Sequence, residues 1–328
     1  MTLVSRTQML DEAKNGRKGH GWFIEILIFI ALFFVTDEIM SIPTVVATVF
    51  AAMNNPEFQA ASQAAYSGES VDYMELISRL MGTLPWWYTL FSLFVAGLQI
   101  VTGIFFCTKI QKRTVASMGF RKGNVLKEYL MGALIGTVAI AATVGIGVLI
   151  GAFTISKASF SPIFFIYTLA YILQGAGEEV MCRGCLLTSI SRKNPVWLAV
   201  LLNSVMFAVL HLLNPGISVL AFVNLVLFGV FFSLYFLKRG NIWGVCAMHT
   251  CWNLFQGNFF GISVSGTGAG LGTVFSTVEK AGVNSLLSGG AFGIEGGICT
   301  TIITALGILF CLFVLPSKKN ELVAEEAV

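Results

Sequence analysis

Three ionisable residues stand together just after an apolar run in this 328-residue chain. The segment GEEVMCR (177–183) places Glu178, Glu179 and Arg183 a few residues beyond PIFFIYTLAYIL (162–173). An Arg or Asp at the centre of a membrane helix costs about 2.5–3.5 kcal/mol on insertion scales, so ionisable residues kept there are functional-site candidates. Residues four apart share a helix face, so we expect Glu179 to pair with Arg183. Glu178 projects about 100° away, which leaves its carboxylate for another partner.

Two of the three histidines of the chain lie inside apolar segments. His211 ends the segment FAVLH (207–211), and His249 begins the segment HTCWN (249–253). Helical spacing puts Phe207 beside His211 and Asn253 beside His249. If these side chains converge with Glu178, one low-dielectric cavity contains a carboxylate, two imidazoles and a carboxamide.

Such a set of groups indicates hydrolytic chemistry. A carboxylate beside an imidazole can orient a water molecule and remove its proton. The second histidine and the asparagine then offer hydrogen-bond donors where charge develops on a carbonyl oxygen. The pattern therefore favours attack of water on an amide or ester. Proton- or ion-coupled transport and a structural polar network remain alternative interpretations, because membrane helices keep histidines for those purposes too.

The composition identifies an integral membrane protein. The chain is 56% hydrophobic and 11% charged, with a mean hydropathy of +0.81, whereas soluble domains contain about 25% charged residues. The net charge of +3 gives no indication of a nucleic-acid partner. Cys182 and Cys185 form a single CxxC spacing within an apolar segment, and we interpret them as buried small hydrophobic residues.

The apolar runs predict an all-α fold, a polytopic bundle of about eight transmembrane helices. Runs of about 20 apolar residues match a bilayer core about 30 Å thick. The expected spans are 22–42, 85–108, 128–152, 160–182, 196–213, 218–237, 242–260 and 297–315. Basic residues gather before the first span and after the second, fourth, sixth and eighth. The positive-inside rule therefore predicts that both termini are cytoplasmic.

The chain divides into three expected segments. Residues 1–108 form an N-terminal region with two spans, 109–260 a transmembrane core, and 261–328 a glycine-rich external loop, the last span and a cytoplasmic tail. Glycines are concentrated in 257–297, and glycine favours tight turns over regular helices. We expect this stretch to be an ordered loop, with a plain flexible loop as the alternative.

The helical rise raises one difficulty for the proposed cavity. At 1.5 Å per residue, His211 lies about 24 Å along the fifth span and His249 only about 12 Å along the seventh, counted from the same side. We expect the starts of these helices to differ from the positions given above, since helix ends are the least certain feature of a sequence-based prediction.

Taken together, the three polar segments resemble the CAAX-protease and bacteriocin-processing family of intramembrane proteases, also called the Abi family. The signature of that family is Glu-Glu-x-x-x-Arg, then Phe-x-x-x-His, then His-x-x-x-Asn or Asp on successive core helices. These motifs stand here as EEVMCR (178–183), FAVLH (207–211) and HTCWN (249–253). The lead-in to the third motif is also similar, with Gly244 where the family usually has proline. The resemblance covers roughly 115–260.

The resemblance implies a role for each matched residue. Glu178 would activate water together with His211, and His249 and Asn253 would stabilise the oxyanion. Glu179 and Arg183 would support them. Members act as glutamate-dependent proteases, although many carry a metalloprotease label. We expect no metal cofactor; if zinc is bound, Glu178, His211 and His249 are the residues that would ligate it.

The resulting expectation is an intramembrane endopeptidase of this family that hydrolyses a peptide bond in a membrane-associated protein or peptide. A non-catalytic bacteriocin-immunity or scaffold protein of the same family is the second interpretation, and an ion- or proton-coupled transporter is the third. The expected surroundings are the lipid bilayer of a bacterial plasma membrane, with a peptide or small protein as the substrate and no nucleic acid.

Overall fold

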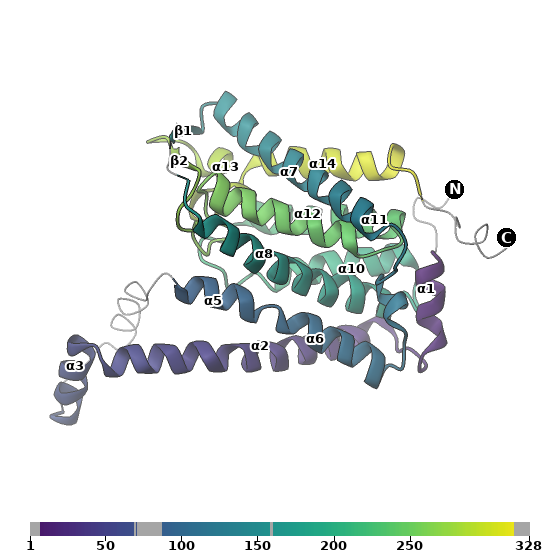
Figure 1. Cartoon of the computed structure of the whole chain (residues 1–328), viewed down its shortest axis with the longest axis horizontal. Helices are drawn as coiled ribbons and strands as arrows, with labels where there is room; N and C mark the ends of the chain where they lie inside the picture. The colour runs from purple at the N-terminus through teal and green to yellow at the C-terminus, as the bar shows by residue number, and fades with distance from the viewer. Residues whose placement is uncertain (1–6, 69, 71–86, 158–159, 318–328) are drawn as a thin grey trace.

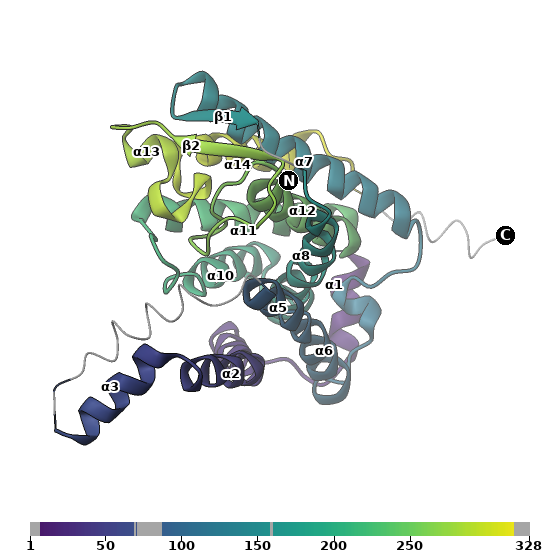
Figure 2. The ribbon, with the colours of Figure 1, turned by 60° about the vertical axis from the view of Figure 1, so that its left-hand side comes forward.

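The computed structural model describes the whole chain except residues 1–6, 69, 71–86, 158–159 and 318–328. Helices running side by side along the long axis make up most of the molecule (Figure 1). They are α2 (Trp22–Met53), α5 (Trp87–Val95), α6 (Leu98–Phe105), α7 (Val125–Leu149), α8 (Ile163–Glu179), α10 (Val196–Val209), α11 (Val219–Arg239), α12 (Trp243–Leu254) and α14 (Ile298–Phe313). Shorter helices are α1 (Gln8–Glu12), α3 (Pro56–Tyr66), α9 (Thr188–Ile190) and α13 (Ser285–Ser288). Figure 2 shows α2 and α3 on the outer side of α5 and α6.

Each of the eight expected spans contains a helix, and the helical-bundle prediction is confirmed to that extent. Within the described residues, three helices are long and apolar enough to cross a membrane: Leu90–Ile110, Val125–Leu149 and Val219–Arg239. The helices at Val196–Val209 and Ile298–Phe313 are apolar but shorter. Eight crossings therefore stay a prediction.

Two helices extend beyond the spans predicted for them. The first continues to Met53, through Pro43. Proline lacks the N–H that would bond to the carbonyl four residues earlier, here that of Ile39. Ser41 and Thr44 donate to the neighbouring carbonyls of Glu38 and Ser41. The fourth continues as a π-helix over Val180–Leu187 and then as α9. The start of the second span, at 85, lies outside the described residues.

The molecule is mostly helical, as predicted, and two short strands pair beside the helices. Strand β1 (Phe153–Lys157) lies antiparallel to β2 (Phe275–Glu279), with Phe153 opposite Glu279 and Lys157 opposite Phe275. A strand of five residues with a partner more than a hundred residues away leaves no local sequence signal. The pairing joins the glycine-rich stretch to the segment that follows α7. The choice between an ordered and a flexible loop there stays a prediction. Figure 1 shows both strands and α13 at one end of the bundle.

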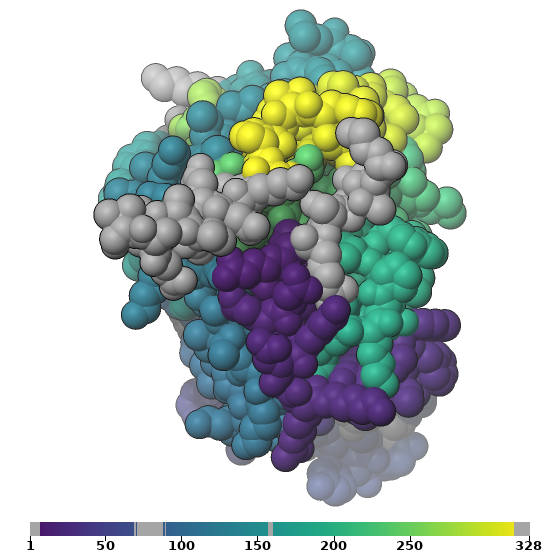
Figure 3. Space-filling view, turned by 90° about the vertical axis from the view of Figure 1, so that its right-hand side faces the viewer, coloured from purple at the N-terminus to yellow at the C-terminus, as the bar shows by residue number. Residues whose placement is uncertain are grey.

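The connecting segments expected on one side of the membrane meet at the opposite end. Arg17 N donates to the carbonyl of Gln111 at 2.8 Å, and Arg192 Nη1 donates to the carbonyl of Arg17 at 2.9 Å. Ile242 N donates to the carbonyl of Gly119 at 2.9 Å. Figure 3 shows α1 (purple) lying across this end. The alternation of the loops agrees with the prediction, while the cytoplasmic location of this end stays a prediction.

The three expected segments of the chain share one bundle. Helix α14 packs against α11 and α7, and α5 packs against α8. The ion pair between Arg239 and Glu128, 2.6 Å long, joins the end of α11 to the start of α7. The boundaries at 108 and 260 stay a prediction.

Two glycines bring α7 and α12 into direct backbone contact. A Cβ added to Gly132 would lie 1.9 Å from the carbonyl oxygen of Gly244, and one added to Gly136 would lie 2.5 Å from that of Met248. Small residues allow membrane helices to approach closely. Met248 precedes His249, so this contact places the helix that carries the third motif. Gly244, which departs from the family pattern, is part of the same contact.

The starts of the two histidine-bearing helices agree with the sequence-based positions to within one residue. Helix α10 begins at Val196 and α12 at Trp243, so our expectation of misplaced starts is wrong. The ring of His249 lies beside Phe207, with 6.2 Å between the ring centroids. Phe207 is one turn before His211. The four residues from Phe207 to His211 account for about 6 Å of the difference in depth, half of the value expected from the helical rise.

Replacing Gly132 with alanine should loosen this contact. Gly132→Ala should lower the free energy of unfolding by about 1–3 kcal/mol, because extra volume in a close-packed contact costs that much. Gly145→Ala is the matched control on the same helix, since no atom lies within 4 Å of the added Cβ. The control should be neutral or more stable by up to about 1 kcal/mol. Denaturation in detergent, followed by circular dichroism, measures both variants. Equal stabilities would contradict the close approach.

Candidate active site

The two adjacent glutamates occupy different environments, as the helical spacing predicts. Glu179 is fully buried, and its Oε1 accepts from Arg183 Nη1 at 2.8 Å. Glu178 is 22% exposed and lines a cavity. The predicted ion pair is confirmed, and one carboxylate of the pair is left facing the cavity.

Aromatic rings surround the charge of Arg183. The guanidinium carbon lies 4.8 Å from the centroid of the Phe207 ring and 5.5 Å from that of Phe232. Nη2 also donates to the carbonyl of Gly229 at 3.3 Å. A desolvated cation over aromatic faces is stabilised electrostatically by the rings. Arg183 therefore ties the π-helical continuation of α8 to α10 and α11.

His249 lies between the two carboxylates. Its Nδ1 is 2.8 Å from Glu179 Oε1, and its Nε2 is 3.8 Å from Glu178 Oε2. The rings of Phe207, Phe228 and Phe232 lie edge-on to the imidazole, with centroids 5.8–6.2 Å away. Because Glu179 is also bonded to Arg183, its carboxylate holds the imidazole orientation from the buried side. Sequence reasoning paired Glu178 with His211, whereas the imidazole that approaches Glu178 here is that of His249.

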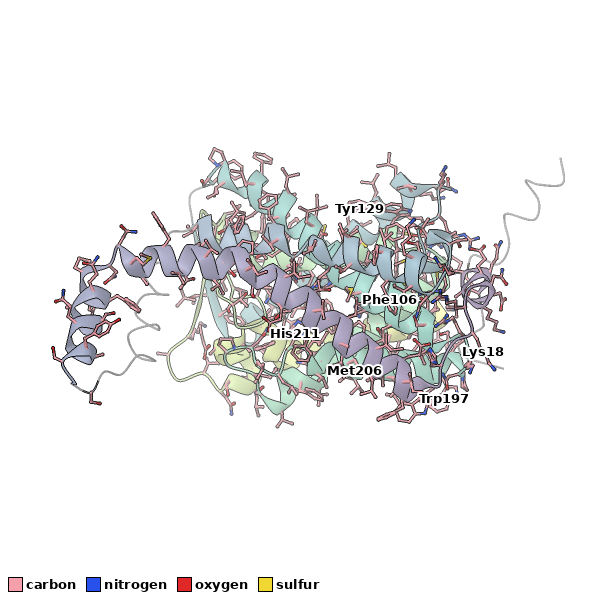
Figure 4. The ribbon with its side chains drawn as sticks, turned by 90° about the horizontal axis from the view of Figure 1, so that it is seen from below. Lys18, Phe106, Tyr129, Trp197, Met206 and His211 are labelled. Carbon is pink, nitrogen blue, oxygen red and sulfur yellow. The ribbon has the colours of Figure 1, made fainter. Side chains whose placement is uncertain are left out.

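His211 lies in the turn after α10 and is half-buried. Its Nδ1 is 2.8 Å from the carbonyl oxygen of Phe207, and the two rings are 4.8 Å apart. A carbonyl oxygen only accepts, so Nδ1 carries the proton and Nε2 of the neutral imidazole carries the lone pair. Across the described residues, no hydrogen bond or ion pair joins His211 to Glu178. Figure 4 shows Trp197, Met206 and His211 following one another from the end of the bundle towards its middle.

Gln174 belongs to the site and was missed by the sequence analysis. Its Nε2 donates to Glu178 Oε1, and its Oε1 accepts from Asn253 Nδ2 at 3.0 Å. The side chain therefore connects the carboxamide of Asn253 to the carboxylate of Glu178. Gln174 precedes Glu178 by four residues, so the same spacing rule that paired Glu179 with Arg183 could have found it.

One cavity brings the four candidate catalytic residues together. Glu178, His211, His249 and Asn253 all line it, and its volume is about 140 Å³. Its walls include Tyr171, Phe207 and Phe228, and the glycine-rich segment 264–270 with Glu295 covers one side. The arrangement can hold a polar reactant between a carboxylate and two imidazoles, with aromatic surface around it.

The three residues that could ligate zinc do not form a ligand set. Within the described part of the chain, no group of three His, Cys, Asp or Glu side chains could hold a metal ion. Nδ1 of His249 is bonded to Glu179 and Nδ1 of His211 to backbone, so each ring keeps Nε2 for another partner. Metal-ligating histidines commonly have such a bond on the other ring nitrogen, so the absence of a metal cofactor stays a prediction. All seven cysteines are free thiols, and Cys182 and Cys185 are buried, in agreement with our interpretation of that pair.

Comparison with known families assigns the part of the chain that contains these motifs. Residues 159–255 match the family model described as Rce1-like, type II CAAX prenyl endopeptidase. This segment, called the Rce1-like domain below, is similar to that family and spans less than a third of the chain. The Rce1-like domain contains all three motifs and Gln174, and it ends before the glycine-rich segment that covers the cavity. No curated protein and no solved structure matches the chain significantly.

Removing Arg183 should cost the protein much of its stability. Arg183→Met leaves the fully buried Glu179 without its cation, and breaking a buried pair costs about 3–5 kcal/mol of unfolding free energy. Arg121→Met is the matched control, because Arg121 and Glu12 form an ion pair in which both side chains are partly exposed. That change should cost at most about 1 kcal/mol. Urea denaturation in detergent measures both, and similar losses would contradict the central position of the Glu179 pair.

Proposed function

We propose that the chain is an intramembrane endopeptidase that hydrolyses a peptide bond in a membrane-associated protein or peptide. The observation that carries this proposal is the convergence of Glu178, His211, His249 and Asn253 on one cavity within a bundle that contains an Rce1-like domain. The general base, the imidazoles and the carboxamide then act on one carbonyl group.

The first step proposed is the activation of water by Glu178. A water held between Glu178 and Nε2 of His211 loses a proton to the carboxylate as its oxygen bonds to the carbonyl carbon. The carbonyl π electrons move to the oxygen, which becomes an oxyanion. Gln174 orients the Glu178 carboxylate by its hydrogen bond. When the C–N bond breaks, the proton on Glu178 passes to the leaving amine, which restores the carboxylate.

His249 and Asn253 are proposed to stabilise the oxyanion. Asn253 Nδ2 carries two hydrogens, one of which goes to Gln174, so the other can be donated to the substrate. Nδ1 of His249 bonds to Glu179, so Nε2 donates when the imidazole is cationic. Two donors in a cavity walled by Tyr171, Phe207 and Phe228 stabilise developing charge more than they would in bulk water.

The substrate is proposed to be a peptide or small protein that reaches the site from the membrane. Rce1-like endopeptidases are named for prenylated CAAX substrates, and processing of a bacteriocin-like peptide is the alternative within the same chemistry. We place the chain in a bacterial plasma membrane with its basic end in the cytoplasm, because basic connecting segments stay on that side.

Substitution of Glu178 should abolish cleavage without unfolding the protein. Glu178→Gln and His211→Ala should each lower turnover by about 10²–10⁴-fold, the range for loss of general acid–base catalysis. Purified protein in detergent is incubated with a mixed pool of peptides and lipopeptides, and products are identified by mass spectrometry. Glu38→Gln, an exposed glutamate of α2, is the matched control and should keep full turnover.

The same assay separates the proposed mechanism from its alternatives. We expect a chelator to leave turnover unchanged; loss restored by zinc would assign these residues to a metal site. Unchanged cleavage by Glu178→Gln would overturn the assignment of the base. A non-catalytic immunity protein would keep its cellular phenotype in that variant, and a transporter would show uptake lost on histidine substitution.

Removal of the Asn253 carboxamide should affect the chemical step more than binding. Asn253→Ala should lower kcat by about 10²–10³-fold, as for loss of one oxyanion donor, with KM changed by less than about 3-fold. Asn194→Ala is the control, since Asn194 only caps the carbonyl of Ile190 at the far end of the bundle. A rise in KM at constant kcat in Asn253→Ala would instead assign this residue to substrate binding.

A further inference from the structure

The side of the cavity formed by the glycine-rich segment is held in a strained conformation. Ser265 has a φ of +45°, a left-handed conformation that side chains other than glycine rarely adopt. Residues at such angles persist only where their surroundings hold them. Ser265 lines the cavity that contains Glu178 and His211. The contacts of Ser265 therefore decide where this side of the cavity lies.

Glu295 holds Ser265 from within the protein. The side chain is only 6% exposed. Its Oε2 accepts from Ser265 N at 2.6 Å, from Ser265 Oγ at 3.0 Å and from Gln256 Nε2 at 3.1 Å. Burial raises the pKa of Glu295, and the hydrogen bonds from Ser265 and Gln256 act in the opposite direction. One carboxylate oxygen thus fixes both the backbone and the side chain of the strained residue.

The hydrogen bonds between Glu295 and Ser265 connect to the segments that carry the candidate catalytic residues. Asn214 Nδ2 donates to the carbonyl of Ser265 at 2.9 Å, and Asn214 N donates to the carbonyl of His211 at 3.0 Å. Gln256 lies three residues after Asn253, in the π-helix Phe255–Phe259 that continues α12. Glu295 therefore joins the turn of His211 to the end of the helix that carries Asn253.

We propose that Glu295 is a positioning residue of the active site. It holds Ser265 against the turn of His211 and, through Gln256, against the end of α12. Glu295 lies outside the Rce1-like domain, which ends at 255, so the glycine-rich segment supplies a part of the site that the domain lacks. The expected effect on kcat rests on the proposed endopeptidase function. The expected effect on local structure rests on the hydrogen bonds alone.

The kinetic test separates positioning from folding. Glu295→Ala should lower kcat of the folded protein by about 10–100-fold with KM changed by less than about 3-fold, because small misplacements of catalytic groups cost rates of that order. Glu295→Gln keeps an acceptor oxygen and should recover kcat to within about 3-fold of wild type. Glu279→Ala is the matched control, an exposed carboxylate of β2 in the same glycine-rich segment, and should match wild type.

Amide hydrogen exchange gives a readout that does not depend on proteolysis. Glu295→Ala should raise exchange by about 10-fold or more in 264–268 and 211–217 and leave α7 and α11 unchanged, because only the local tie is lost. If Glu295→Ala does not fold, Ser265→Ala removes the hydroxyl bond alone and should raise exchange locally with a smaller loss of kcat.

Each outcome decides the proposal. Amide exchange raised only in these segments of Glu295→Ala, together with a selective loss of kcat, supports it. If the wild-type protein cleaves nothing but Glu295→Ala shows the same local rise in exchange, the hydrogen bonds of Glu295 hold these segments as proposed and the endopeptidase function fails. Exchange raised throughout the bundle, with wild-type kcat in the folded fraction, would assign Glu295 to stability and overturn the proposal. Wild-type exchange and kcat in Glu295→Ala would overturn it as well.

Discussion

The buried carboxylate of Glu179 joins the guanidinium and the imidazole on which the rest of the site depends. It bonds to Arg183 on its own helix and to His249 on α12, both at 2.8 Å. An unpaired carboxylate at this depth would be very costly, so both partners are held to it. The orientation of the His249 ring follows from this contact, since Nδ1 is committed to Glu179 and Nε2 is left on the side of Glu178.

The packing of the helices makes that contact reachable. Glycines on α7 remove the side chains that would keep α12 away, and the aromatic rings of α10 and α11 close around Arg183 and His249. A low-dielectric surrounding strengthens each hydrogen bond of the network and makes each unpaired group more expensive. The polar groups are therefore few, and most are bonded to one another: Asn253 to Gln174, Gln174 to Glu178, and Glu179 to both Arg183 and His249.

The Rce1-like domain supplies these groups but does not enclose them. The glycine-rich segment, in the part of the chain after 255, covers the cavity through Ser265 and Glu295. Long-range contacts hold it in this place, among them the pairing of β1 with β2 and the bond from Asn214 to Ser265. Helices thus provide the catalytic candidates, and a glycine-rich loop completes the cavity. The composition of that loop is equally compatible with an ordered and a flexible conformation.

The sequence by itself determined the features that depend on neighbours along the chain. The 3.6-residue period predicted the pair Glu179–Arg183 and the contact between Phe207 and His211, and would also have found Gln174 beside Glu178. The lengths of the apolar runs predicted the helices. The first helix was expected to end before Pro43, but it continues to Met53. Only the tertiary structure decided that His249, rather than His211, contacts Glu178, that β1 pairs with β2, and that Glu295 holds Ser265. Those contacts join residues 30 to 126 positions apart, as the pairs Ser265–Glu295 and Phe153–Glu279 illustrate. No local period specifies them, because they form only when the helices pack.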